Sequence, residues 1–172
     1  MKNKIIIPLI LSFFMLLAVT ESAGITKIFL NPSTTKNSVG STLTVDINVE
    51  NVANFYGWDF TLYYDTRILD VKNVTEGSFM KNLGSTLFNV DTKDNYNSTH
   101  GRIWIYSALF APSTPASGSG TLARIEFNSV RTGKTSIVFS DTEMADVNAN
   151  KIDHELISGS YEFVSIPKPR FV

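Results

Sequence analysis

Residues 57–65 read Gly57-Trp58-Asp59-Phe60-Thr61-Leu62-Tyr63-Tyr64-Asp65, and a second apolar stretch, Ile68-Leu69-Asp70-Val71, follows a short break. From Trp58 to Tyr64 every second residue is large and apolar, and the residues between them are small or polar. Successive side chains of a strand point to opposite faces, so this order gives one apolar face and one polar face. The stretch therefore predicts a half-buried strand in a sandwich of antiparallel sheets.

The rest of the chain repeats this pattern and shows no long segment with a helical period. Short alternating segments are bounded by Gly, Asn, Asp, Ser or Pro, as strands are. The predicted strands span residues 27–31, 43–49, 57–64, 69–76, 86–91, 102–109, 121–130, 135–140 and 160–165. About nine short strands without a repeat predict an all-β fold, an antiparallel β-sandwich of jelly-roll topology. Residues 111–120, rich in Pro, Ser and Thr, are expected to form an exposed irregular loop.

The N-terminus has the composition of a targeting segment. Lys2 and Lys4 precede an apolar run over residues 5–19, and small residues follow, which together predict a signal peptide over residues 1–23. The alternative is an uncleaved anchor, although the run is shorter than the roughly 20 residues that a spanning helix needs. We expect a sandwich over residues 24–165 and a Pro-containing tail or linker over residues 166–172.

Bulk composition excludes several classes of function. The 172-residue chain has a formal net charge of −1 and no cysteine, so we expect no nucleic-acid partner, no disulfide and no thiolate-ligated zinc. The protein is expected to be extracellular, secreted free or retained at the cell surface, without membrane insertion once the signal peptide is removed. The fold must then be held by its hydrophobic core alone.

Motifs for catalysis and for metal binding are weak. The two histidines, His100 and His154, lie in polar contexts, and no nucleophile elbow or phosphate loop is present. We therefore expect no catalytic residue, no cofactor and no metal site. Residues 146–150, Asp-Val-Asn-Ala-Asn, resemble the start of a calcium loop but lack its later glycine and acid, and a tight turn is the alternative. Asn73 and Asn97 match the acceptor pattern for N-glycosylation.

A second alternating segment carries the functional expectation. In residues 102–106 the two isoleucines are expected to face inward, which leaves Arg102, Trp104 and Tyr106 facing outward. Large aromatic side chains on an outer sheet face indicate contact with a partner. The alternative is that a loop of the same chain, such as residues 111–120, covers this face.

Three stretches, residues 57–71, 101–107 and 118–127, resemble strands of the cohesin domain, and they occur in the family's order. The resemblance covers residues 25–164 and implies that a dockerin module binds one flat sheet face. It implies a partner-binding set made of the outward residues of two strands: Asp59, Thr61, Tyr63, Arg102, Trp104 and Tyr106. Asp59 matches an acidic residue typical of the family, whereas Gly57 stands where the family often has Asn.

The resemblance thus implies a non-catalytic extracellular module that binds a dockerin-bearing protein and assembles enzymes or surface proteins, in a context of polysaccharide degradation. The dockerin would bring its own calcium. One alternative is a carbohydrate-binding module that binds polysaccharide through exposed aromatic residues. Another is a structural or adhesive domain of a surface layer. Charged and polar residues beside the aromatic ones favour the protein partner.

Overall fold

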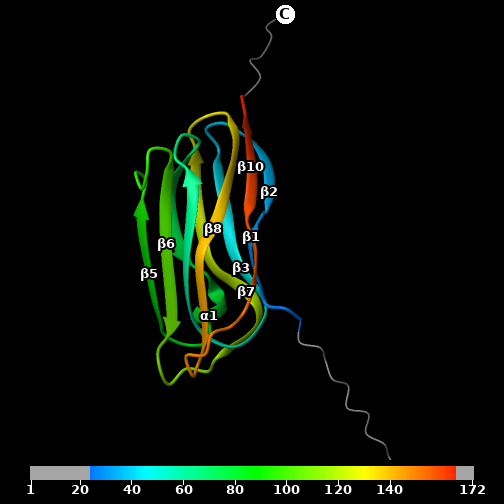
Figure 1. Cartoon of the computed structure of the whole chain (residues 1–172), viewed down its shortest axis with the longest axis vertical. Coiled ribbons are helices and arrows are strands. Elements are labelled where there is room, and N and C mark those ends of the chain that lie inside the picture. The colour runs from blue at the N-terminus through cyan, green and yellow to red at the C-terminus, as the bar shows by residue number, and fades with distance from the viewer. Residues whose placement is uncertain (1–23, 166–172) are drawn as a thin grey trace, which may run out of the picture.

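The computed structural model describes residues 24–165, so the predicted signal peptide and the Pro-containing tail lie outside the described residues. The described chain is nearly all strand (Figure 1). Its elements are β1 (Lys27–Asn31), β2 (Thr34–Ser38), β3 (Thr42–Asp65), β4 (Leu69–Glu76), α1 (Ser78–Lys81), β5 (Thr86–Lys93), β6 (His100–Leu109), β7 (Ala116–Ser129), β8 (Gly133–Asp146), β9 (Glu155–Ile157) and β10 (Gly159–Val164).

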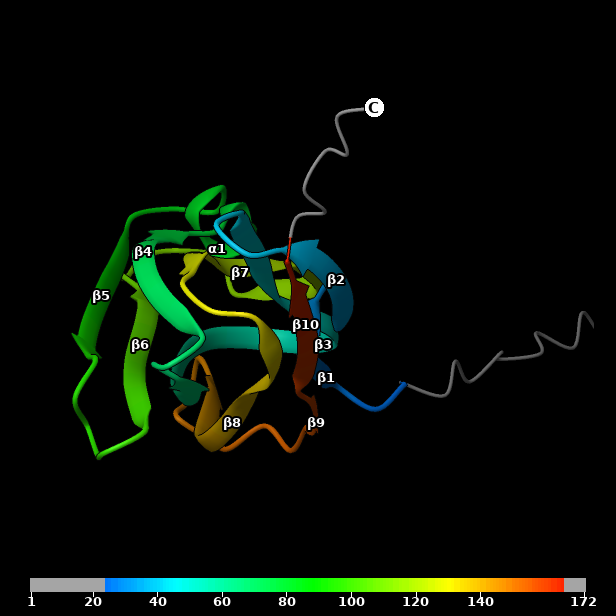
Figure 2. The ribbon, with the colours of Figure 1, turned by 90° about the horizontal axis from the view of Figure 1, so that it is seen from above.

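The strands form two layers that enclose the core, as the end-on view in Figure 2 shows. One layer has the order β5, β6, the C-terminal half of β3, β8, β10 and β2. The other has the order β4, β7, the N-terminal half of β3, β1 and β9. Most pairings are antiparallel, and only β1–β9 and β2–β10 are parallel among the described strands. The predicted antiparallel sandwich of jelly-roll type is confirmed.

Strand β3 belongs to both layers. The two strands expected over residues 43–49 and 57–64 are one continuous strand of 24 residues. Between its halves, Asn51 and Asn54 have positive φ angles of 57° and 53°, and the register against β7 shifts twice. Asparagine tolerates this conformation better than most residues, and such bulges bend a strand without ending it. β3 therefore passes from one sheet to the other.

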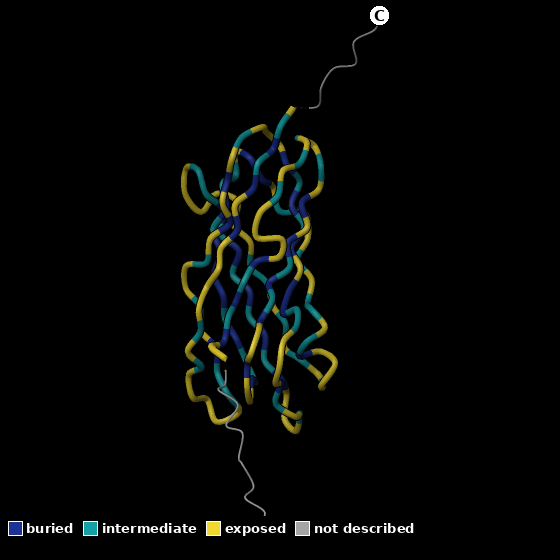
Figure 3. Tube along the Cα trace, turned by 90° about the vertical axis from the view of Figure 1, so that its right-hand side faces the viewer, coloured by how far each residue is buried: buried dark blue, intermediate teal, exposed yellow. Residues whose placement is uncertain are grey.

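The core lies between the layers and follows the predicted alternation. Trp58 is 4% exposed, and Phe60, Leu62 and Tyr64 are fully buried. Figure 3 shows buried and more exposed positions alternating along the strands, with exposed residues concentrated in the turns. The less buried residues of each strand therefore lie on the outer surface of its layer. Within residues 24–165, no helix is long and apolar enough to cross a membrane.

Two local expectations were wrong or incomplete. The edge strands β2 and β9 were not predicted, because neither has an alternating apolar pattern that burial would require. The segment over residues 111–120 is not irregular throughout, since β7 already begins at Ala116 and pairs with β3 there.

The two ends of the described chain lie toward opposite ends of the long axis (Figure 1).

Candidate binding face

Strands β3 and β6 lie side by side in antiparallel register, which brings the six expected partner-binding residues onto one surface. The cross-strand pairs are Asp59 with Tyr106, Thr61 with Trp104, and Tyr63 with Arg102. Ile103 and Ile105, between them, are fully buried. Facing pairs in a sheet share one side. We call the outer surface formed by Asp59, Thr61, Tyr63, Arg102, Trp104 and Tyr106 the aromatic face.

Trp104 is the centre of the aromatic face and is held on two sides. Its ring centroid lies 4.9 Å from that of Tyr106, with an interplanar angle of 42°. Its indole Nε1–H donates a hydrogen bond of 2.5 Å to Oδ1 of Asp59. The Tyr106 hydroxyl in turn accepts a bond of 2.6 Å from Nδ2 of Asn89 on β5. These contacts hold the two rings in fixed orientations on the outer surface of the sheet.

Thr61 differs from the expectation of an accessible side chain. It points outward by its register but is only 9% exposed. Its neighbour on one side is Trp104, and on the other side the register of β8 shifts between Phe139 and Thr142, so that extra residues stand opposite Thr61. The bulky indole and the bulge together enclose the small threonine. Thr61 therefore supports the aromatic face from below more than it offers contact area.

The opposite end of the aromatic face is polar and is partly covered by the loop between β5 and β6. Arg102 forms an ion pair with Asp91 on β5, and its guanidinium carbon lies 5.6 Å from the ring centroid of Tyr96. The Tyr96 ring also packs against that of Tyr63, with centroids 5.1 Å apart and the ring planes tilted by 41°. The covering loop is thus residues 94–99 and not residues 111–120, the segment expected from the sequence as the alternative. Tyr96 remains 48% exposed and adds an aromatic group to this end.

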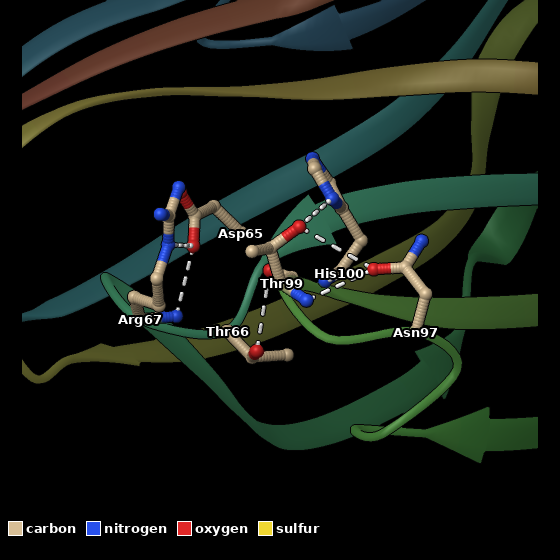
Figure 4. A network of polar contacts seen from close by, with 6 residues as sticks. All are labelled: Asp65, Thr66, Arg67, Asn97, Thr99 and His100. Carbon is tan, nitrogen blue, oxygen red and sulfur yellow. Dashed lines mark hydrogen bonds and ion pairs between the residues drawn. The ribbon is translucent and has the colours of Figure 1, made fainter.

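A network of short polar contacts fixes that loop (Figure 4). The Asn97 side-chain oxygen accepts hydrogen bonds from the backbone N–H groups of Thr99 and His100, at 2.9 and 2.8 Å. Thr66, after β3, donates its backbone N–H to the Thr99 carbonyl at 3.1 Å. Nδ1 of His100 lies 2.8 Å from the Thr99 hydroxyl. His100 therefore has a structural partner at the start of β6, in keeping with a turn role.

Asp65 and Arg67 complete the network in Figure 4 at the turn after β3. The guanidinium of Arg67 donates to both carboxylate oxygens of Asp65, at 2.9 and 2.6 Å. This hydrogen bonding is the main reason that the pKa of the Asp65 carboxyl lies below its usual range. The pair closes the turn between β3 and β4.

At the turn of residues 146–150, both side-chain oxygens of Asp146 accept hydrogen bonds from within the turn. Oδ1 of Asp146 accepts hydrogen bonds from the backbone N–H groups of Asn148 and Asn150, both at 2.8 Å, and Oδ2 accepts one of 3.0 Å from the Asn150 amide. Hydrogen bonds from Asn150 are the largest cause of a lowered pKa of Asp146. This is the geometry of an Asx turn, the alternative to a calcium loop. In the described residues, no group of three or more His, Asp or Glu side chains is placed to hold a metal ion.

Neighbouring strands enlarge the aromatic face beyond what the sequence indicated. β8 pairs with β3 so that Glu143 stands opposite Asp59 and Ala145 opposite Gly57. A depression of about 470 Å³ lies over this junction, between Trp104 and Tyr106 on one side and Lys151 on the other. The predicted strand over residues 135–140 stopped short of Glu143, because the polar run from Ser140 to Glu143 hides the strand's continuation. The only signal in the sequence for the continuation of β8 is an alternation of apolar and polar residues that resumes after the bulge.

The two acceptor asparagines are both exposed. Asn97 lies in the loop described above, and Asn73 lies on β4 where its register against β7 shifts. Glycosylation at either position stays a prediction.

Comparison with known proteins identifies the family. The model of the cohesin domain matches residues 28–163. Among solved structures, a non-cellulosomal cohesin from the archaeon Archaeoglobus fulgidus is similar with a TM-score of 0.68 and 22% identity, covering 83% of this chain and 93% of that one. A cohesin in a type I cohesin–dockerin complex from Clostridium thermocellum gives 0.66 and 20%, covering 82% and 100%. A type II cohesin module of an Acetivibrio cellulolyticus scaffoldin gives 0.65 and 16%, covering 84% and 94%.

A search of curated proteins found no match. The family match spans most of the chain, and the layers, the strand register and the solved structures agree with it. This chain belongs to the cohesin domain family.

Proposed function

We propose that this chain is a non-catalytic extracellular receptor that binds the dockerin module of another protein through the aromatic face and so assembles proteins into a complex. The register that gathers Asp59, Trp104 and Tyr106 on one outer sheet surface carries the proposal. Solved relatives from Clostridium thermocellum and Acetivibrio cellulolyticus are cohesins in complex with dockerins. The mixed composition of the face, aromatic at its centre and charged at its ends, is typical of a protein-binding surface.

The geometry favours a protein partner over a polysaccharide. A flat sugar chain stacks on aromatic rings that share one plane. Here the planes of Trp104 and Tyr106 are inclined by 42°, and those of Tyr63 and Tyr96 by 41°. Carboxylate and guanidinium groups also interrupt the row of rings. These features favour a folded protein with an uneven surface over a flat sugar chain as the partner.

Titration calorimetry with a panel of purified dockerin modules tests the proposal, with calcium present and with calcium removed by a chelator. We expect at least one module to bind in calcium, since the dockerin needs the ion for its fold. Gel retardation in soluble polysaccharide is the parallel assay for the alternative. Retardation by polysaccharide, together with no binding across the dockerin panel, would contradict the proposal.

A further inference from the structure

The two acceptor patterns for N-glycosylation have no part in the proposed function, and they lie in different structural settings. Residues 73–75, Asn-Val-Thr, belong to strand β4, whereas residues 97–99, Asn-Ser-Thr, lie in the loop between β5 and β6. Both asparagines are exposed, so the exposure of the side chain does not distinguish them. The surrounding backbone does.

The side chain of Asn97 is oriented by its oxygen atom, and its nitrogen atom is free. Oδ1 accepts the backbone N–H groups of Thr99 and His100 and, at 3.4 Å, the Thr99 hydroxyl (Figure 4). Within residues 24–165, Nδ2 of Asn97 donates no hydrogen bond. This arrangement is an Asx turn. It leaves the atom to which an N-linked glycan is attached outside the hydrogen bonds of the loop.

A glycan on Asn97 is compatible with the loop as it stands. The sugar replaces one hydrogen atom of Nδ2 and leaves Oδ1 an amide oxygen, so the bonds from Thr99 and His100 persist. Ser98, the middle residue of the pattern, is exposed. None of residues 97–99 belongs to a strand. An enzyme can therefore reach this tripeptide without separating any strand from its neighbour.

Asn73 carries the same amide group in a setting that restricts access. Residues 73–75 pair with β7, and Val74, the middle residue of the pattern, is partly buried against the core. A transferase has to contact both the asparagine amide and the hydroxyl two residues later. The segment around Asn73 would first have to leave β7 and expose Val74, and such local opening costs free energy. The loop around Asn97 does not require it.

We propose that Asn97 is the acceptor site for an N-linked glycan in the folded protein and that the fold protects Asn73 from the same reaction. The donor is an oligosaccharide joined to a lipid through pyrophosphate. Nδ2 of Asn97 forms a bond to C1 of the first sugar while the bond from C1 to the phosphate oxygen breaks. The lipid pyrophosphate leaves with that electron pair, and a base of the transferase takes one proton from Nδ2.

The position of Asn97 places the glycan beside the aromatic face. Asn97 follows Tyr96, whose ring centroid lies 5.1 Å from that of Tyr63 and 5.6 Å from the guanidinium carbon of Arg102. An N-linked glycan is bulky and hydrophilic. It would therefore border the polar end of the aromatic face, whichever partner binds there.

Glycosylation in vitro tests the proposal on folded protein purified from a host without N-glycosylation. The reagents are an oligosaccharyltransferase that accepts Asn-X-Ser/Thr and its lipid-linked oligosaccharide, and glycopeptide mass spectrometry measures the occupancy of each asparagine. Synthetic peptides of residues 70–78 and 94–102 carry the two patterns without the fold and show the enzyme's preference between the sequences. We expect the ratio of Asn97 to Asn73 occupancy to be at least about tenfold higher in the folded protein than in the peptides.

Variants at the hydroxyl position of each pattern supply matched controls. Thr99→Ala should abolish modification of Asn97, and Thr99→Ser, which keeps the hydroxyl, should retain it. Thr75→Ala makes the same change in the other pattern and should leave the occupancy of Asn97 unchanged. Asn97→Asp keeps an oxygen that accepts the bonds of the loop but lacks the nitrogen, so it should take no glycan there. Thermal unfolding of each variant shows that it is folded.

Three results would overturn the inference. The first is an equal ratio of the two occupancies in the folded protein and in the peptides. The second is modification of the folded protein mainly at Asn73. The third is a folded protein that stays unmodified at Asn97 under conditions in which the peptide of residues 94–102 is modified. None of these measurements involves a dockerin, so their outcome is independent of the proposed function.

Discussion

Truncation of Trp104 is the most direct test of the aromatic face. Trp104→Ala removes the ring that packs against Tyr106 and the N–H that donates a hydrogen bond of 2.5 Å to the Asp59 carboxylate. Tryptophan at the centre of an interface is typically worth about 2 kcal/mol or more on truncation. That loss corresponds to about a thirtyfold rise in Kd for a dockerin that binds the unmodified protein.

Trp104→Phe divides this loss into its parts. Phenylalanine keeps a ring beside Tyr106 but cannot donate to Asp59, so the carboxylate loses the bond that orients it. We expect a smaller loss of about 1 kcal/mol, or about fivefold in Kd, because only the hydrogen bond and its preorganisation are removed.

Titration calorimetry of both variants supplies the measurement, and Phe29→Ala is the matched control. Phe29 is an outward aromatic residue on β1, in the other layer, so its truncation should leave Kd unchanged. Both Trp104 variants should keep a cooperative unfolding transition, since the side chain points away from the core. Full affinity in a folded Trp104→Ala protein would refute the assignment of this face. So would an equal loss in the Phe29 control.

Three further predictions concern the fold and export. Phe60→Ala should lower the free energy of unfolding by about 3–5 kcal/mol, because Phe60 is fully buried, whereas the exposed Thr44→Ala should change it by less than about 0.5 kcal/mol; equal losses in urea unfolding would contradict the alternation. The pKa of the Asp65 carboxyl is lower in the folded protein than in the unfolded chain. Its charged form therefore stabilises the fold fully at pH values above the unfolded pKa of about 4, and this contribution disappears as the pH falls through the folded pKa. Asp65→Asn should therefore reduce the decrease in the free energy of unfolding at acidic pH. An unchanged dependence on pH would contradict this role of Asp65. N-terminal sequencing of the exported protein should start between Glu21 and Ile25, and an intact start in a membrane fraction would show an anchor instead.

The sequence predicts the sheet face of each residue where apolar and polar residues alternate without interruption. Trp58 to Tyr64 and Arg102 to Tyr106 were placed on their correct faces, because burial on one side forces a period of two. Once these two strands are neighbours in the sheet, their outward residues lie on one surface. This is why most of the aromatic face could be predicted from the sequence.

The remainder of the face depends on features that a local pattern does not contain. Glu143 was missed because a bulge in β8 interrupts the alternation and moves the later residues to the other face. Tyr96 was missed because it reaches the face from a loop, through contacts with Tyr63 and Arg102. The enclosure of Thr61 likewise follows from the sizes of its neighbours on other strands. Each of these outcomes is set by tertiary contacts.

The positions of the chain ends have a mechanical consequence. Because the two described ends lie toward opposite ends of the long axis (Figure 1), a tensile load applied through them acts nearly along β1 and β10. β1 is bonded along its length to β3, and β10 to both β8 and β2. Ladder bonds run across the strands, so sliding either terminal strand would strain its whole ladder at once instead of opening one bond after another. The same sandwich that presents the aromatic face on its side is thereby arranged to bear force along its length.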